Sequence, residues 1–528
     1  MDLEQYFEPF RKNIIGNKQK FDTPFGERQI LYADWVASAR FYQPIEDQMM
    51  KYVLPYAANT HTESNITGTT MTRAYEASKQ IIKDHVNASP ADKLIYCGSG
   101  MTGAIAKLQR ILGLQVPERF ESYLEGTDLE NPRRLISKVK AAQAQKYHFK
   151  ENHKPVVFVS HMEHHSNHTS WLETICDVEI INFNEDGLVC IDHFRELLDK
   201  YKDREFKIAS ITGCSNVTGI ETPYYEISRM IHEVGGLCFV DFAASAPYCK
   251  IDMHPEDEDT YLDAIFFSPH KFLGGPGTPG ILIFNEVLYK NKRPDNPGGG
   301  TVSFTSPWYM HDYIDDIEAR EDGGTPPFIQ GIRAALVVKL KEQMGVGNIK
   351  ARKNELLTHF LDAMEEIPEV EVMAQHIRNR HGVVSFNVKN IHYNLVTKVL
   401  NDKYGIQVRG GCVCAGTYGH MLMNLDQKAS KKIRNKILKG DNSFKPGFVR
   451  LSLHPTLKNK ELDYIIGAIK DIVQNQQEFK NSYTYLMGKN EFEYTNGSDF
   501  DHDPSSVIFK LRNLTTENMV LDLLAQEY

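Results

Sequence analysis

The sequence predicts an α/β fold: a mostly parallel central sheet in a large domain, followed by a smaller α+β domain. Between residues 93 and 284, short apolar runs of strand length alternate with stretches of helical apolar spacing. Glycine and hydroxyl residues follow several of these runs, which is typical of strand–turn–helix units. The pattern from residue 331 to 366 is helical, and three further apolar runs follow, at residues 382–388, 406–409 and 447–453.

These changes of pattern predict the domain boundaries. We expect the large domain at residues 1–330 and the small domain at residues 331–473. The segment 1–45 is expected to pack with the small domain, and the charge-rich residues 115–153 to form a surface insertion. Residues 474–528 form a polar and aromatic extension, and its sequence indicates no role.

The chain is predicted to begin with an N-terminal helix. A short strand follows at residues 32–36 and a further helix at 72–87. The predicted strands of the central sheet are residues 93–97, 155–160, 206–211, 236–240, 263–267 and 280–284. Ligands of parallel α/β sheets bind at the carboxyl ends of the strands, so polar side chains there are candidate site residues. They are Thr102, His164, Asn216, Asp241 and Lys271.

Composition excludes several classes of function. The 528 residues can form two or three domains with substantial cores, and 41% hydrophobic with 24% charged residues is ordinary for a globular protein. A net charge of −9 argues against nucleic acid as a partner. No apolar run approaches the roughly 18 residues that span a bilayer, and the N-terminus lacks a signal-peptide pattern. Eight scattered cysteines favour a reducing cytoplasm over a disulfide framework.

The stretch Phe267–Gly280, FSPHKFLGGPGTPG, contains the strongest candidate group. Lys271 stands at a strand end, where burial would depress its pKa and allow the neutral amine to form a Schiff base with a carbonyl. Ser268 and His270 can donate hydrogen bonds to an anion, and the glycines that follow allow close approach of backbone to a ligand. The alternative is a surface loop with a solvated lysine.

Two further motifs have more than one interpretation. The turn Gly98–Thr102 begins a predicted helix, so Met101 and Thr102 lie where free N–H groups bind phosphate; the alternative is an ordinary strand-to-helix connection. The histidine-rich segment His161–His168 could bind a metal, but no third ligand stands at a diagnostic spacing. We therefore expect no metal, and expect His164 to stack on a flat ring.

One cofactor would use all of these groups. Pyridoxal 5′-phosphate needs a lysine for its carbonyl, hydroxyls and a helix N-terminus for its phosphate, and a carboxylate for its ring nitrogen. Lys271, Thr102 and Asp241 match these needs, and His164 would cover one face of the ring.

With these motifs, the chain resembles the fold-type I pyridoxal-phosphate enzymes of the class V aminotransferase family, most closely the cysteine desulfurase/selenocysteine lyase branch. The resemblance covers residues 30–473 apart from the insertion. The segments that match family motifs are Ser99–Thr102, Met162–Asn167, Ser215–Gly219, Val240–Asp241 and Phe267–Lys271.

The resemblance extends to the small domain. Cys414, in Val408–Ala415, stands at the position of the family's catalytic cysteine, with Cys412 two residues before it. Arg450 matches the arginine that receives the substrate carboxylate, where a bidentate fork is required. Arg409 stands where its charge would favour the Cys414 thiolate and help bind substrate, together with Asn216.

The resemblance implies that L-cysteine is converted to alanine and a persulfide on Cys414, with a protein as sulfur acceptor. It also implies a homodimer, in which residues 298–301 or 323–325 lie near the partner's phosphate. No interaction with nucleic acid or membrane is expected.

Two departures leave alternatives open. Ala244 stands where the family usually has a glutamine, and residues 415–420 differ from the usual pattern. The chain could therefore be another class V enzyme, an aminotransferase, epimerase or lyase, in which Cys414 and Cys412 are only small buried residues. A non-enzymatic descendant is the third interpretation, and the retained Lys271 and Asp241 argue against it.

Overall fold

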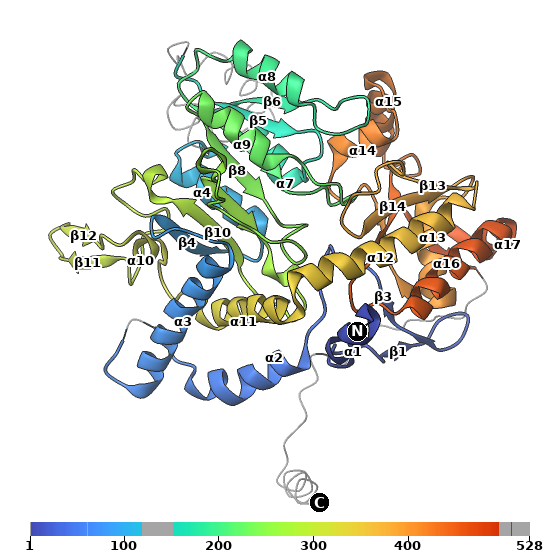
Figure 1. Cartoon of the computed structure of the whole chain (residues 1–528), viewed down its shortest axis with the longest axis horizontal. Coiled ribbons are helices and arrows are strands. Elements are labelled where there is room, and N and C mark those ends of the chain that lie inside the picture. The colour runs from blue at the N-terminus through green and yellow to red at the C-terminus, as the bar shows by residue number, and fades with distance from the viewer. Residues whose placement is uncertain (1, 61, 119–151, 496–507, 509–528) are drawn as a thin grey trace, which may run out of the picture.

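The computed structural model describes residues 2–60, 62–118, 152–495 and 508 (Figure 1). The predicted insertion at 115–153 lies almost entirely outside the described residues, and so does the extension beyond residue 495 apart from Ile508. Within the described ranges, no helix is both long and apolar enough to cross a membrane.

The large domain is built on a seven-stranded sheet in the order β4-β10-β9-β8-β7-β5-β6. Its strands are β4 (Asp92–Cys97), β5 (Val156–Ser160), β6 (Asp177–Ile181), β7 (Lys207–Thr212), β8 (Leu237–Asp241), β9 (Ala264–Phe267) and β10 (Gly280–Asn285). Neighbouring strands from β6 to β9 are parallel, and β10 is antiparallel to both β4 and β9. The prediction of a mostly parallel central sheet is confirmed.

The sequence analysis missed strand β6. It lies at the edge of the sheet, and four of its five residues are half-buried. An edge strand buries less apolar surface than a central one, so this segment does not show as an apolar run.

Helices cover both faces of the sheet (Figure 1). On one face, side chains such as Phe158 and Ile265 pack with α3 (Ile66–His85), α8 (Ile191–Lys200), α9 (Tyr224–Glu233) and α11 (Phe328–Met344). On the other face, Val157 and Phe266 pack with α4 (Met101–Ile111) and α7 (His165–Leu172). Burial on both faces explains why the central strands are continuous apolar runs.

The small domain has a four-stranded antiparallel sheet in the order β13-β14-β17-β16. Its elements are α12 (Val346–Glu365), β13 (Val370–Val372), β14 (Val383–Val388), α13 (Tyr393–Tyr404), β16 (Arg409–Gly411), α14 (Gly416–Leu422), α15 (Gln427–Ile437), β17 (Phe448–Ser452) and α16 (Asn459–Gln474). The helical pattern predicted at 331–366 is confirmed, and it is divided between two helices. Gly345, with φ +72°, separates α11 from α12.

The N-terminal segment lies against the small domain. It contains α1 (Leu3–Lys12), the β1–β2 hairpin (Lys20–Phe21, Arg28–Gln29) and β3 (Leu31–Tyr32). The next helix, α2 (Gln43–Gln48), packs on the large domain instead, where Arg333 Nη2 of α11 donates to Glu46 Oε2 at 2.9 Å. Strand β3 pairs in parallel with β15 (Ile406–Gln407). The strand expected at residues 32–36 is shorter than predicted, because the chain turns after Tyr32 towards the carboxyl edge of the large sheet. The boundary at residue 330 stays a prediction.

Part of the C-terminal extension also packs on the small domain. It forms α17 (Gln476–Ser482) and a hairpin of β18 (Tyr483–Leu486) and β19 (Glu491–Tyr494). The ring of Tyr494 lies 5.3 Å from that of Phe25, and Asn490 Nδ2 donates to Tyr393 Oη at 3.0 Å. These contacts give residues 474–495 a place in the fold that the sequence analysis did not predict.

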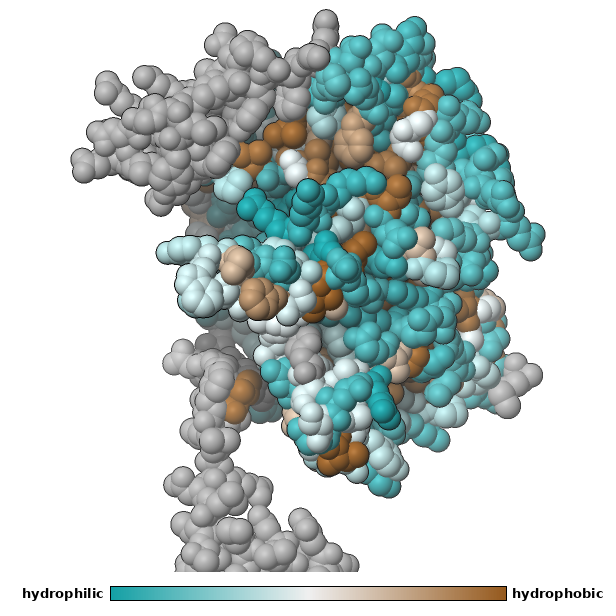
Figure 2. All heavy atoms as spheres, turned by 90° about the vertical axis from the view of Figure 1, so that its left-hand side faces the viewer, coloured by the Kyte–Doolittle hydropathy of each residue, from teal (hydrophilic) through white to brown (hydrophobic). Residues whose placement is uncertain are grey.

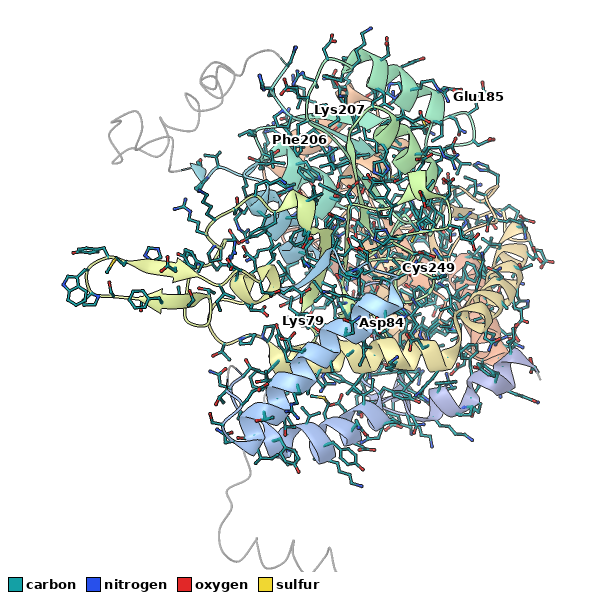
Figure 3. All side chains as sticks on the ribbon, turned by 60° about the vertical axis from the view of Figure 1, so that its left-hand side comes forward. Lys79, Asp84, Glu185, Phe206, Lys207 and Cys249 are labelled. Carbon is teal, nitrogen blue, oxygen red and sulfur yellow. The ribbon has the colours of Figure 1, made fainter. Side chains whose placement is uncertain are left out.

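A further hairpin, β11 (Val302–Thr305) and β12 (His311–Tyr313), projects from the large domain (Figure 3). The residues at its tip, Trp308 and Tyr309, are exposed. On the side of the molecule that carries this hairpin, the described surface is mostly hydrophilic, with scattered hydrophobic residues (Figure 2).

The chain that follows this hairpin, α10 (Ile317–Glu321), is fixed to α4 by a buried ion pair. Lys107 Nζ lies 2.6 Å from Glu321 Oε2, and their side chains are 5% and 0% exposed. Tyr289 Oη also donates to Glu321 Oε1 at 2.6 Å. Since both charges are removed from water, removing either side chain would leave the other charge buried without this partner, which is costly.

We predict that Lys107→Met lowers the free energy of unfolding by about 3 kcal/mol, because it leaves the buried Glu321 carboxylate without its cation. Urea denaturation of the two proteins at neutral pH measures the difference. Lys202→Met, at a lysine whose side chain is 65% exposed, is the matched control and should change stability by less than about 0.5 kcal/mol. A loss below about 1 kcal/mol for Lys107→Met would contradict the prediction.

Candidate active site

Lys271 is the last residue of a single 3₁₀ turn, Pro269–Lys271, that follows β9. Its backbone N–H donates to Ser268 O at 3.0 Å. The chain then folds back on this turn, so closely that a Cβ at Gly275 would clash with the carbonyl oxygen of Pro269. Only glycine fits at this position. The glycines of this loop were predicted to let the backbone approach a ligand. At Gly275 the backbone instead approaches another part of the protein's own backbone.

The N-terminus of α4 lies beside this turn. Its N-cap residue, Gly100, provides no side-chain cap, so the first N–H groups of the helix are not capped from within. Met101 N donates to Ser268 Oγ at 2.8 Å, and Thr102 Oγ1 lies 2.7 Å from Ser166 Oγ. Hydroxyl groups and helix N–H groups thus converge at one place, and their chemistry suits an anion such as phosphate.

Burial sets the charges around Lys271. Burial lowers the pKa of Lys271, and the carboxylate of Asp241 opposes this shift. Burial also raises the pKa of Asp241 to about 6, against a hydrogen bond from Ala243 N at 2.8 Å and the charge of Lys271. The pKa of His270 falls to about 4, through burial and the neighbouring Lys271. The site therefore holds an amine with a depressed pKa opposite one buried carboxyl.

His164 precedes α7 as its N-cap residue, and its Nδ1 accepts from Ser166 N at 3.1 Å. Burial, and then the charge of Lys271, lowers the pKa of His164 to about 3. The ring is therefore neutral at physiological pH, as a ring that stacks on a flat ligand should be.

Glu163 is a buried group that the sequence analysis missed. Its Oε1 accepts from Ser160 Oγ at 2.6 Å and Thr212 N at 2.8 Å, and its Oε2 accepts from Asn167 Nδ2 at 2.7 Å. These bonds connect the end of β5, helix α7 and the end of β7, and so position His164. An acidic residue three positions after an apolar strand was the available signal.

The small domain contributes two arginines to the site. Arg450 Nη2 and Arg409 Nε each lie 2.9 Å from a carboxylate oxygen of Asp34. The Arg450 side chain is buried, whereas that of Arg409 is half exposed. The sequence analysis did not single out Asp34, since a lone acid in a short predicted strand gives no sign of two partners 375 and 416 residues away.

Arg450 and Asn216 both keep unused hydrogen-bonding capacity. Arg450 Nη1 lies 3.4 Å from the backbone oxygen of Asn216. Within the described part of the chain, Arg450 Nε and Asn216 Oδ1 are buried and have no hydrogen-bond partner. A buried donor and a buried acceptor left unpaired side by side indicate a place for a polar ligand.

Cys414 is exposed, and its backbone is held against the large domain. Asn216 Nδ2 donates to Val413 O at 2.6 Å, and His165 N donates to Cys414 O at 2.7 Å. Gly416 N donates to His165 Nε2 at 2.9 Å. Val413 and Cys414 both have positive φ, +45° and +60°, which is strained for a β-branched residue such as valine.

The residues after Cys414 contact other groups. Tyr418 Oη lies 3.3 Å from Thr218 Oγ1, and His420 Nδ1 lies 2.7 Å from Gly416 O. Neither side chain has a hydrogen bond to Cys414 among the described residues. Tyr418 and His420 therefore fix the position of α14 and leave the thiol free.

Ala244 is buried in a small apolar cluster with Val36, Cys214 and Val383. This cluster joins the large domain, the N-terminal segment and the small domain. A methyl group fits such a place, so no side chain at position 244 donates a hydrogen bond to a ligand.

The structure thus brings most of the predicted site residues to one edge of the sheet. The charge of Lys271 acts on His164 and His270, and that of Arg450 acts on Lys271. The residues that meet there are Met101 (through its N–H), Thr102, His164, Asn216, Asp241, Ser268, His270, Lys271, Cys414 and Arg450. Arg409 lies at the rim.

Known proteins are similar to this chain in sequence or in fold. A cysteine desulfurase from Haloferax volcanii is 30% identical over 262 residues, which span 49% of this chain and 59% of that protein. A probable cysteine desulfurase from Halalkalibacterium halodurans is 26% identical over 391 residues, 73% of this chain and 84% of that protein. The apo structure of a cysteine desulfurase from Thermococcus onnurineus NA1 has the same fold, with a TM-score of 0.67 at 21% identity over 89% of this chain and 98% of that one.

The aminotransferase class V family model matches residues 139–465. This match covers more than half of the sequence and includes the segments of Asp241, Lys271, Cys414 and Arg450. The family and branch expected from the motifs are therefore confirmed. The chain belongs to the aminotransferase class V family, in its cysteine desulfurase-like branch.

Proposed function

We propose that this protein is a pyridoxal 5′-phosphate-dependent cysteine desulfurase, which converts L-cysteine to alanine and carries the sulfur as a persulfide on Cys414. The observation that carries the proposal is the position of Cys414: Asn216 and His165 hold the backbone oxygens of Val413 and Cys414 at the edge of the Lys271 site, and Cys414 itself is exposed. The names of the similar proteins support the same reaction.

Pyridoxal 5′-phosphate fits the residues present. The N-terminus of α4, where Met101 N donates to Ser268 Oγ, together with Thr102 and His270, suits its phosphate. Asp241 suits the ring nitrogen, and the neutral His164 suits one face of the ring. When bound to Lys271, the cofactor supplies an electron sink for bonds at the substrate Cα.

The protein's own groups then have separate tasks. Lys271, whose pKa is depressed by burial, holds and moves a proton at the substrate Cα. Arg450 binds the substrate carboxylate through its unused Nε and a guanidinium nitrogen released from Asp34, and Asn216 and Arg409 complete the substrate side.

Cys414 carries out the sulfur transfer. Its thiolate attacks the sulfur of L-cysteine, so that an S–S bond forms and the substrate's Cβ–S bond breaks. The electron pair of that bond stays with the three-carbon product, which is protonated and leaves as alanine. The transferred sulfur is oxidised by two electrons and the carbon is reduced by two, so no external oxidant is needed.

We also propose that the protein is a cytoplasmic homodimer, with an acceptor protein for the sulfur. The segment 41–66 exposes large apolar side chains that a second copy would cover, namely Phe41, Met50, Tyr52, Leu54, Tyr56 and Ile66. The glycine turns 298–301 and 323–325, joined by Gly324 N donating to Gly299 O at 2.8 Å, would lie near the partner's phosphate. All eight cysteines are free, as a reducing compartment would keep them.

One observation favours a second candidate, another class V reaction that does not use Cys414. The buried Ala244 offers no hydrogen bond where the family usually has a glutamine, so the electronics of the cofactor would differ. An aminotransferase, epimerase or lyase acting through Lys271 alone would tolerate this difference.

We predict that Cys414→Ala abolishes alanine formation from L-cysteine, with a loss of at least about 100-fold, because the nucleophile is missing. Alanine and reductant-dependent sulfide are measured together, after the visible absorbance has verified that cofactor is bound. Cys412→Ala, at a half-buried cysteine two residues earlier, is the control and should keep most activity. Cofactor-loaded Cys414→Ala with undiminished turnover of another amino acid would favour the second candidate.

We predict that Arg450→Lys raises the KM for L-cysteine roughly 10- to 100-fold, because a bidentate charge-assisted pair worth about 1.5–3 kcal/mol is lost. Steady-state kinetics at constant cofactor absorbance measure the effect. Arg409→Lys should raise KM less, since its side chain is half exposed and its interactions are screened. An unchanged KM in Arg450→Lys would mean that the substrate carboxylate binds elsewhere.

A further inference from the structure

The segment that follows Cys414 is strongly basic, although the chain as a whole has a net charge of −9. Residues 426–445 include helix α15 and contain seven basic and two acidic residues. The basic residues are Lys428, Lys431, Lys432, Arg434, Lys436, Lys439 and Lys445; the acidic ones are Asp426 and Asp441. We call these seven basic side chains the α15 basic surface.

The fold does not use these charges. Within the described residues, none of the seven forms an ion pair, and α15 has no fully buried residue. Asp426 accepts from Ala429 N as the helix cap, and Asp441 accepts from Ser443. Unpaired like charges close together on one helix are destabilising, so a structural role does not account for them.

Two apolar side chains accompany the charges. Leu438 and Phe444 are exposed, and Lys436 Nζ lies 2.9 Å from the centroid of the Phe444 ring. Exposed apolar groups among basic ones are typical of a surface that a partner covers.

The α15 basic surface is coupled to the turn of the reactive cysteine. Helix α14 begins two residues after Cys414 and lies next to α15 (Figure 1). His420 Nδ1 lies 2.7 Å from Gly416 O, and His420 Nε2 lies 2.9 Å from Ser430 Oγ. A neutral imidazole satisfies both bonds, since Nδ1–H donates to the carbonyl and Nε2 accepts from the hydroxyl.

From these contacts we propose that the α15 basic surface docks an acidic protein segment whose cysteine takes the sulfur from Cys414. The proposal rests on the proposed desulfurase function and names the chemistry of its acceptor. In the transfer, the acceptor thiolate attacks the outer sulfur of the Cys414 persulfide. The S–S bond to Cys414 breaks, Cys414 leaves as a thiolate, and a persulfide forms on the acceptor, with no net oxidation.

A protein fits this surface better than a nucleic acid. Direct transfer of the outer sulfur needs a thiolate, which a nucleic acid does not carry. A long polyanion would also meet the remaining negative charge of the chain, whereas a local acidic segment meets only the basic surface.

A binding experiment tests the docking without any catalysis. A fluorescent 15-residue peptide rich in glutamate, with serine in place of cysteine, is titrated with cofactor-loaded enzyme at low salt. We expect binding that weakens as salt is added, and that is at least about tenfold weaker in the triple variant Lys428→Glu/Lys431→Glu/Lys432→Glu. The triple variant Lys350→Glu/Lys460→Glu/Lys18→Glu makes the same change of net charge at exposed lysines elsewhere and should bind like the wild type.

A transfer experiment then uses peptides with one cysteine, in which the acidic residues are glutamate or glutamine. Enzyme loaded with sulfur from L-cysteine is mixed with each peptide, and the gain of one sulfur atom is followed by mass spectrometry. We expect the glutamate peptide to react at least about tenfold faster with the wild type, and this preference to disappear in the α15 variant alone. Alanine release with a small thiol reductant should be unchanged in both triple variants.

The outcomes separate the two proposals. Equal binding and equal rates for the glutamate and glutamine peptides would overturn the docking proposal while alanine release continues. Saturable binding of polyuridylate that is lost in the α15 variant, without a preference between peptides, would also overturn it and assign the surface to nucleic acid. Absence of alanine would instead overturn the desulfurase function, and peptide binding would still report on the docking.

Discussion

The arrangement of the active site depends on one carboxylate, that of Asp34, which lies between the guanidinium groups of Arg409 and Arg450. Asp34 comes from the N-terminal segment, and the arginines come from two strands of the small domain. Ser452 N also donates to Ala33 O at 2.7 Å, and Val36 N donates to Ser452 Oγ at 3.2 Å, so this segment is bound to the small domain on both sides of the acid. Because a buried cation without its anion is costly, these contacts hold the small domain in one position over the sheet edge.

Burial at this edge then determines the chemistry. It lowers the pKa values of Lys271 and His164 and raises that of Asp241, so each group favours the neutral form it would avoid in water. The Cys414 segment is held less firmly. Positive φ angles at Val413 and Cys414 cost about 1–3 kcal/mol each, and the two hydrogen bonds that hold their carbonyls return about 1 kcal/mol each. The net free energy that holds this backbone in place is therefore small. This suits a thiol that must reach a substrate and then an acceptor.

Much of the site was predictable because its residues follow strands. Thr102, Asn216 and Lys271 stand four or five residues after the ends of apolar runs, and parallel strands end at a common edge. Asp34 and Glu163 were missed for a different reason. The partners of Asp34 are set by packing between distant segments, which spacing along the chain does not show. Glu163 binds the nearby Ser160 and Asn167, and only its bond from Thr212 depends on a distant strand. The break at Gly345 was missed because helical apolar spacing continues on both sides of it.

The sequence by itself predicted the fold class from local periodicity, and strand-end motifs that resemble a known family predicted the family and the residues expected to hold a phosphorylated cofactor, because both are short-range signals. Only the tertiary structure decided that Asp34 joins the two arginines, that Ala244 lies in an apolar cluster, and that Cys414 stays exposed beside a basic helix. These features arise where the two domains and the N-terminal segment meet. Contacts of that kind depend on how separate elements pack, and no single stretch of sequence encodes them.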